Sequence, residues 1–119
     1  MADRVLVVED EEDLRHSVAE VLRLEGYDVS TAANGQEALE ELQNGDGRPS
    51  LILLDMMMPV MDGWTFRRRQ LEDPELADIP VVVFTSAKNV DENQDLDVSV
   101  VLEKPVGIDR LVEVVEEHI

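Results

Sequence analysis

The stretch Ser50-Leu51-Ile52-Leu53-Leu54-Asp55 decides the fold, because four apolar residues in a row end on a charged one. A run this short and this apolar is typical of a β-strand buried on both faces, as in parallel sheets covered by helices. Other apolar runs also end on polar residues: Val5 to Val8 before Glu9 and Asp10, Val81 to Phe84 before Thr85, and Val98 to Leu102 before Lys104-Pro105. Because the carboxyl ends of parallel strands share one edge of the sheet, the sequence predicts a site at that edge.

Length and composition predict one domain over residues 1–119. A chain of 119 residues can bury a single core without metal or disulfide staples. It contains no cysteine, so its fold cannot depend on disulfides, which suits a reducing compartment.

The formal net charge of −18 limits the classes of partner that this domain can bind. It repels phosphate backbones and anionic lipid, so we expect neither nucleic-acid nor membrane binding by this domain. The basic run Arg67-Arg68-Arg69 is interpreted as a solvated helix face. No basic leader and no apolar segment of roughly 18 residues is present, so the expected location is cytoplasmic.

Segments of helical period alternate with the apolar runs, a pattern that predicts a parallel sheet with crossover helices. Gly26 is expected to end the first helix, and Asn34 to cap the second with Glu37 in a capping box. The expected strands are 4–8, 28–32, 50–54, 81–84 ending at Thr85, and 98–102. The expected helices are 13–25, 34–44, 64–71 with an extension after Pro74 left open, a short one in 89–97, and 108–119.

Three acids at the strand ends indicate a metal site. Placing carboxylates about 4 Å apart costs on the order of 1–4 kcal/mol per pair unless a cation lies between them. Glu9, Asp10 and Asp55 offer only oxygen ligands, which favours Mg²⁺ over Zn²⁺, with Mn²⁺ as a substitute in vitro.

Two further strand-end residues favour phosphoryl chemistry. Lys104 supplies a positive charge and Thr85 a hydroxyl donor, both suited to phosphoryl oxygens that the metal does not cover. Asp55 is then placed to act as a nucleophile and form an aspartyl phosphate.

Several motifs, in order and over the whole chain, resemble the receiver domains of two-component response regulators. They are Val7-Val8-Glu9-Asp10, Leu53-Leu54-Asp55-Met56-Met57-Met58-Pro59 with Met61-Asp62-Gly63, Pro80 to Thr85, and Lys104-Pro105. The resemblance implies a flavodoxin-like, doubly wound α/β fold with five parallel strands in the order 2-1-3-4-5 and about five helices, the fourth short.

The resemblance also implies a role for each site residue. Asp55 would accept a phosphoryl group from a histidine kinase or phosphotransfer protein and signal to a downstream protein target. Asp10 and Asp55 would bind the metal directly, Glu9 through water, and Met57 through its backbone carbonyl. Thr85 and Lys104 would bind the phosphoryl oxygens, and the bond before Pro105 would be cis.

One departure from the family pattern concerns signalling. Val101 stands at the switch position, where the family usually has a Tyr or Phe whose ring follows Thr85. The segment between Thr85 and Lys104 is also short, so the fourth helix is expected to be stunted and the usual switching route is in doubt.

Two other functions remain open from the sequence. A pseudo-receiver would share the fold and bind proteins without phosphate. A phosphohydrolase using Asp55 is disfavoured because haloacid-dehalogenase-like enzymes need a second Asp at the position of Met57. We therefore expect no metabolic enzyme, only a domain that catalyses its own phosphorylation and dephosphorylation.

Overall fold

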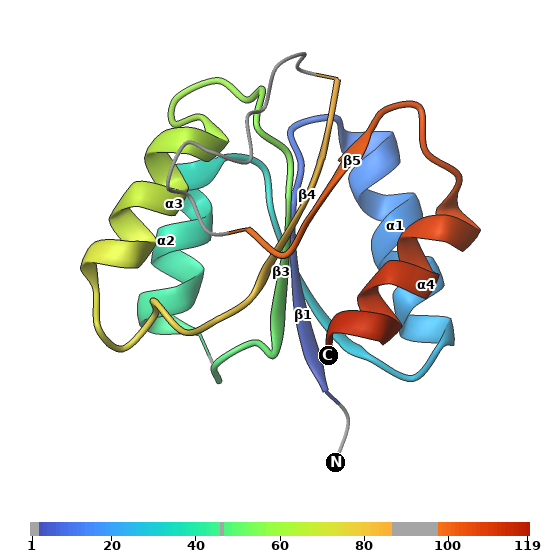
Figure 1. Cartoon of the computed structure of the whole chain (residues 1–119), viewed down its shortest axis with the longest axis horizontal. Coiled ribbons are helices and arrows are strands. Elements are labelled where there is room, and N and C mark those ends of the chain that lie inside the picture. Colours follow the sequence, from blue (N-terminus) through green and yellow to red (C-terminus); the bar gives the residue numbers. More distant parts are fainter. Residues whose placement is uncertain (1–2, 46, 87–97) are drawn as a thin grey trace.

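Strands and helices alternate along the chain as far as Thr85, as the sequence predicts. The computed structural model describes residues 3–45, 47–86 and 98–119. The elements over these ranges are β1 (Arg4–Val8), α1 (Glu12–Leu24), β2 (Asp28–Ala32), α2 (Gly35–Asn44), β3 (Leu51–Leu54), α3 (Gly63–Glu72), β4 (Val81–Thr85), β5 (Val100–Glu103) and α4 (Ile108–His118). They form one sheet with helices on both sides (Figure 1).

The strand order is β2-β1-β3-β4-β5 and every pairing is parallel, which confirms the predicted topology. Val8 pairs with both Ala32 and Leu54, so β1, β2 and β3 end level with one another. Main-chain bonds continue past the strand ends: the Asp55 amide donates to the Val8 carbonyl at 3.0 Å. The register therefore brings Glu9 and Asp55 out of the sheet side by side.

The sheet separates two apolar clusters. Helices α2 and α3 cover one face, and α1 and α4 cover the other (Figure 1). Along β1, Leu6 and Val8 point into the first cluster, and Val5 and Val7 point into the second. The near-continuous apolar runs of β1, β3 and β4 follow from this burial on both faces.

Two expected helix boundaries are confirmed. Gly26 has a φ of 99° just after α1, a conformation that glycine adopts at no steric cost. The Asn34 side chain caps α2 by accepting a hydrogen bond from the Glu37 amide at 2.9 Å. The Glu37 carboxylate accepts from the Ala33 amide at 3.1 Å, one residue before the donor of a capping box.

The extension of the third helix after Pro74 is absent, because α3 ends at Glu72 and residues 74–78 form a turn. A side chain of α3 holds this turn in place. The side-chain Nε2 of Gln70 donates to the carbonyls of Leu76 and Ile79 at 2.9 and 3.1 Å. These bonds satisfy carbonyls that would be buried without a helical partner.

The interpretation of the arginine run as a solvated face is wrong for its first member. Arg68 and Arg69 are exposed, but Arg67 is only 2% exposed. Its guanidinium donates to the Gln70 side-chain oxygen at 2.7 Å. The helical period turns Arg67 toward the sheet, where this bond offsets part of the cost of burying its charge.

The fifth strand begins at Val100 rather than Val98 and ends at Glu103. The short helix expected in 89–97 lies outside the described residues. Within the described ranges, no helix combines the length and apolar character needed to cross a bilayer.

Candidate functional site

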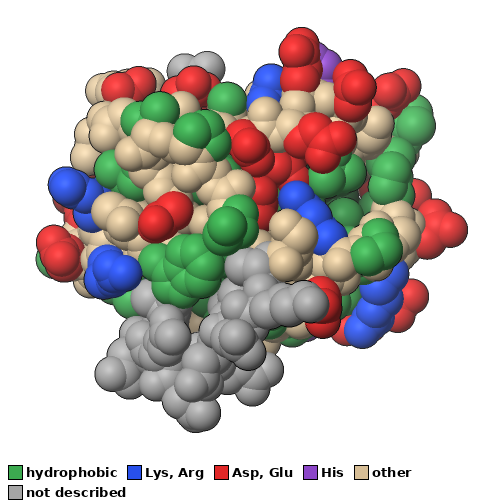
Figure 2. Space-filling view, turned by 90° about the horizontal axis from the view of Figure 1, so that it is seen from above, with side chains coloured by type: hydrophobic (Ala, Val, Ile, Leu, Met, Phe, Trp, Pro, Cys, Tyr) green, Lys and Arg blue, Asp and Glu red, His purple; other side chains and the backbone are tan. Residues whose placement is uncertain are grey.

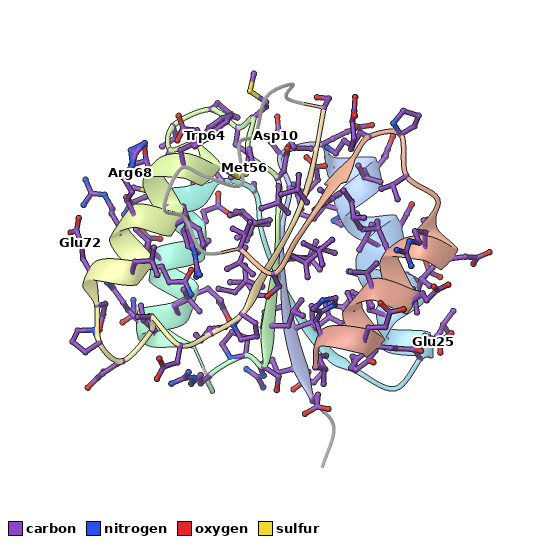
Figure 3. The ribbon with its side chains drawn as sticks, in the orientation of Figure 1. Asp10, Glu25, Met56, Trp64, Arg68 and Glu72 are labelled. Atoms are coloured by element: carbon purple, nitrogen blue, oxygen red, sulfur yellow. The ribbon has the colours of Figure 1, made fainter. Side chains whose placement is uncertain are left out.

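The three acids predicted from the strand ends lie together. Glu9 follows β1 and is 0% exposed, and Asp55 follows β3 and is 2% exposed. Asp10 is exposed and lies at the end of the molecule that faces upward in Figure 3. One carboxylate oxygen from each of the three lies within 4.8 Å of the others. Acidic side chains crowd the centre of this end in Figure 2.

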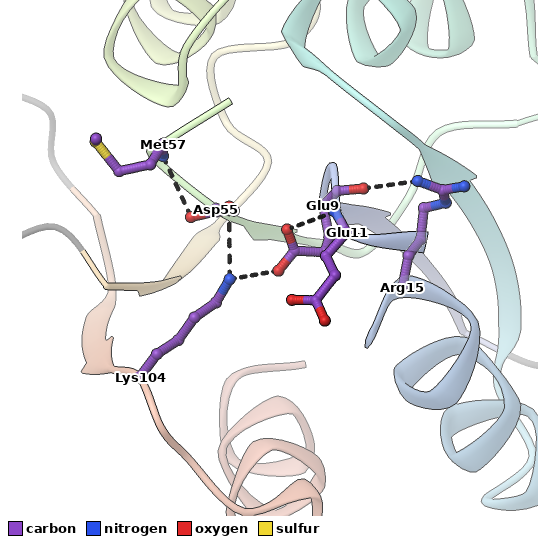
Figure 4. A network of polar contacts seen from close by, with 6 residues as sticks. All are labelled: Glu9, Glu11, Arg15, Asp55, Met57 and Lys104. Carbon is purple, nitrogen blue, oxygen red and sulfur yellow. Dashed lines mark hydrogen bonds and ion pairs between the residues drawn. The ribbon is translucent and has the colours of Figure 1, made fainter. Parts of the chain in front are cut away.

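Lys104 reaches into this cluster from beyond β5 (Figure 4). Its Nζ donates to Glu9 Oε1 and lies 3.5 Å from Asp55 Oδ2. It also lies 5.0 Å from the centre of the Phe84 ring. One ammonium group thus faces two buried carboxylates, and it offsets part of their mutual repulsion.

The pKa of Lys104 is raised above its usual value. Burial lowers the pKa, but the hydrogen bond to Glu9 and the negative charges of Asp55 and Glu9 outweigh burial. The lysine is therefore charged at neutral pH.

Glu9 is held on both sides. Its Oε1 accepts from Lys104, and its Oε2 accepts from the Glu11 amide at 3.2 Å. Its backbone carbonyl accepts from the Arg15 guanidinium at 3.0 Å. Sequence reasoning did not single out Arg15, since a contact between a helix and the loop before it leaves no periodic signal.

Asp55 sits in a tightly packed turn. Its Oδ1 accepts from the Met57 amide at 3.2 Å, while Oδ2 faces Lys104. A Cβ atom added to Gly63 would lie 2.7 Å from the Asp55 carbonyl oxygen. The glycine is thus needed for the start of α3 to pass this close. Met57 is 55% exposed, and metal binding by its carbonyl stays a prediction.

The pKa of Asp10 is raised. Partial burial is the largest cause, followed by a hydrogen bond to Glu9 and the charge of Glu9; contacts with its own backbone and with Asp55 lower it less. The cluster therefore resists holding a third negative charge, which a bound cation would relieve.

Thr85 and Lys104 are joined through the main chain. Thr85 is buried at the end of β4, and its carbonyl accepts from the Lys104 amide at 2.8 Å. The Lys104–Pro105 bond is cis, the isomer that the resemblance implies. Hydroxyl and ammonium thus come from neighbouring strand ends.

The expected switch position lies away from these acids. Val101 pairs with Val83 in the sheet and is half-buried. It packs against the cluster under α2 and α3, to which Trp64 also contributes. No aromatic ring stands at this position.

The arrangement fits a hard divalent cation, because one oxygen donor from each of three acids converges within 4.8 Å. The sequence model of the family described as the response regulator receiver domain matches residues 5–116. The chain belongs to this family. Its members are the receiver domains of response regulators in two-component systems, as the sequence motifs predict.

Relatives in sequence and solved structures point to the same family. The sporulation initiation phosphotransferase F of Bacillus subtilis is 31% identical over 120 residues, covering 100% of this chain and 95% of the relative. The transcriptional regulatory protein PrrA of Mycobacterium tuberculosis is 40% identical over 91 residues, but that match covers only 36% of PrrA. The chemotaxis response regulator CheY4 of Vibrio cholerae superposes with a TM-score of 0.89 at 28% identity, with both chains fully covered.

Proposed function

We propose that Asp55 accepts a phosphoryl group from a histidine kinase or phosphotransfer protein and that the receiver then signals to a downstream protein. The observation that carries this proposal is the position of Lys104, whose Nζ lies 3.5 Å from Asp55 Oδ2 beside the other two acids. This juxtaposition gives a nucleophile a fixed positive charge for the incoming phosphoryl oxygens.

In the proposed transfer, a carboxylate oxygen of Asp55 bonds to phosphorus. The bond between phosphorus and the donor histidine nitrogen breaks, and that nitrogen keeps the electron pair. Lys104 and the Thr85 hydroxyl bind the phosphoryl oxygens, and the Met57 amide keeps Asp55 oriented. The chain thus supplies positioning and charge, the main contributions to phosphoryl transfer.

The proposed cofactor is Mg²⁺, with Mn²⁺ as a substitute. Asp10 and Asp55 would bind it directly, Glu9 through water and Met57 through its carbonyl. When bound, the ion neutralises charge on the carboxylates and phosphoryl oxygens. The close carboxylate oxygens of the cluster support this assignment.

A pseudo-receiver is the second candidate, favoured by Val101 at the position of the usual switch ring. A protein of this kind would bind its partner equally well with and without phosphate. We place either function in the cytoplasm, where a histidine kinase would present its phosphoryl group, and propose no nucleic-acid or membrane contact for this domain.

The test is intact-protein mass spectrometry after incubation with Mg²⁺ and acetyl phosphate. We expect one added phosphoryl group on wild type and none on Asp55→Asn. Asp78→Asn, at an exposed acid away from the cluster, is the matched control and should label normally.

An unchanged mass in wild type, or equal labelling of Asp55→Asn, would refute phosphorylation at Asp55. Omitting Mg²⁺ should slow labelling strongly, and Asp10→Ala should reproduce that loss in its presence. Full labelling without a divalent cation would remove the metal from the proposal.

A further inference from the structure

The chain carries far more acid than base, and the excess reaches well beyond the acceptor site. It has 28 acidic residues against 10 lysines and arginines, and only Lys88 and Lys104 are lysines. Lysine is normally among the commonest residues of a soluble domain. Acidic side chains lie at the margins of the face shown in Figure 2 as well as at its centre.

Much of the basic charge is not paired with these acids. Three arginines donate to main-chain carbonyls instead: Arg15, Arg23 and Arg48. The ion pairs between described residues involve only five acids: Glu9, Asp28, Asp55, Glu113 and Glu117. Most of the described acids therefore have no described cation at ion-pair distance.

Several of these acids stand where a negative charge opposes folding. Glu25 caps the C-terminal end of α1 and Glu116 lies in the last turn of α4, so both face the negative end of a helix dipole. Glu37 and Glu40 are three positions apart on α2, a spacing at which like charges repel. The last turn of α2 contains no basic residue.

The environment of Tyr27 shows that acids from different segments act on one another's surroundings. Burial raises the pKa of the Tyr27 hydroxyl, and three acids raise it further: Glu116, Asp3 and Glu25. These acids belong to α4, to the chain before β1 and to the end of α1. Folding brings their charges together, and the resulting repulsion destabilises the compact state.

The range of this repulsion depends on salt. The Debye length is about 10 Å at 0.1 M salt and about 3 Å at 1 M. Acids three or four positions apart on a helix have Cβ atoms about 5–6 Å apart. Dilute salt therefore leaves such neighbours unscreened from each other, whereas molar salt screens them.

We propose that this domain is adapted to molar monovalent salt, which it needs to reach its full stability. Monovalent cations near the surface take the place of the missing lysines, because they weaken the repulsion that opposes the compact state. The proposal concerns the whole fold, so it holds whether or not Asp55 accepts a phosphoryl group.

The test is thermal unfolding followed by circular dichroism in about 0.1 M and about 2 M KCl, with EDTA present to remove divalent cations. We expect the melting temperature of wild type to be about 10 °C or more higher in the concentrated salt. Loss of the helix signal in dilute salt, restored by KCl, would be the extreme form of the same result. An unchanged or lower melting temperature would overturn the proposal.

Charge variants separate screening from the general effect of salt on apolar burial. The combined variant Glu25→Gln, Glu40→Gln and Glu116→Gln removes three exposed charges and keeps side chains of similar helix propensity. In dilute salt it should melt about 5 °C above wild type, and in concentrated KCl the two should melt together. Gln43→Glu adds an exposed acid three positions after Glu40, so it should lower the melting temperature in dilute salt alone.

A rise with KCl of the same size in wild type and both variants would show that salt acts on apolar burial rather than on charge, and would overturn the proposal. Equal melting temperatures of the three proteins in dilute salt would overturn it too. Neither outcome bears on phosphorylation at Asp55, which labelling with acetyl phosphate tests separately.

Discussion

The central strands and the edge strand β5 differ in how firmly they are packed. Every residue of β3 and β4 is buried, whereas β5 has no buried residue. Asp55 and Thr85 extend from the first kind of strand, and Lys104 comes from the second. The acceptor therefore follows a fully buried strand, and its positive partner follows a more exposed one.

Matched truncations in the two regions should show the largest difference. Leu53→Ala in β3 removes a fully buried side chain, so the free energy of unfolding should fall by about 2–5 kcal/mol. Val101→Ala in β5 should lose about 1 kcal/mol, because that side chain is only half-buried. Urea denaturation measures both, and equal losses would erase the distinction between the strands.

Lys104→Met tests how strongly the charge that follows the exposed strand β5 stabilises the buried acids. It leaves Glu9 buried without its cation, so we expect a loss of about 3 kcal/mol at neutral pH. The raised pKa of Lys104 means that this stabilisation is complete below pH 10.5 and is lost as the pH rises above it. The gap between wild type and variant should narrow there.

Taking the difference between wild type and Lys104→Met at each pH cancels the contribution of other groups that titrate at alkaline pH. Tyr27 also has a raised pKa, from burial and nearby acids, and contributes an alkaline loss to both proteins. A gap that stays constant up to pH 12 would show that Lys104 does not stabilise the fold through its charge.

Two glycine substitutions compare the crowded turn at Asp55 with the open start of α4. Gly63→Ala forces a Cβ to within 2.6 Å of the Met56 sulfur and 2.7 Å of the Asp55 carbonyl oxygen, which should cost about 1–3 kcal/mol. Gly107→Ala is the control before α4, where a Cβ meets no described atom within 4 Å. Thermal unfolding that shifts equally in both variants would show that the Asp55 turn tolerates the added group.

The smallest effect is expected at Val60, which has a φ of 70° and is 84% exposed. A branched residue in this conformation is strained by about 1–2 kcal/mol, and Gly loses part of that gain to chain entropy. Val60→Gly should stabilise the protein by about 0.5 kcal/mol. Val98→Gly, at a half-buried residue without a positive φ, should destabilise it instead.

The resemblance to receiver domains implied the strand order, and the strand-end pattern predicted the meeting of Glu9, Asp10 and Asp55, because parallel strands end on one edge. It could not predict the burial of Arg67 or the absence of helix after Pro74. Both depend on hydrogen bonds that Arg67 and Gln70 make inside the fold, and residue type alone favours the surface for each. The strand-end pattern also placed Lys104 at this edge, but it did not predict that the lysine donates its hydrogen bond to Glu9.

The hydrogen bond from the Lys104 amide to the Thr85 carbonyl makes those two residues a single mechanical unit. A displacement that drew Thr85 toward a bound anion would also pull on the chain that leaves β5. Such motion needs no rotating ring, so the valine at position 101 does not by itself disconnect the acceptor from the outer edge of the sheet. If Asp55 accepts a phosphoryl group as proposed, this main-chain hydrogen bond would offer a second route from the site to that surface.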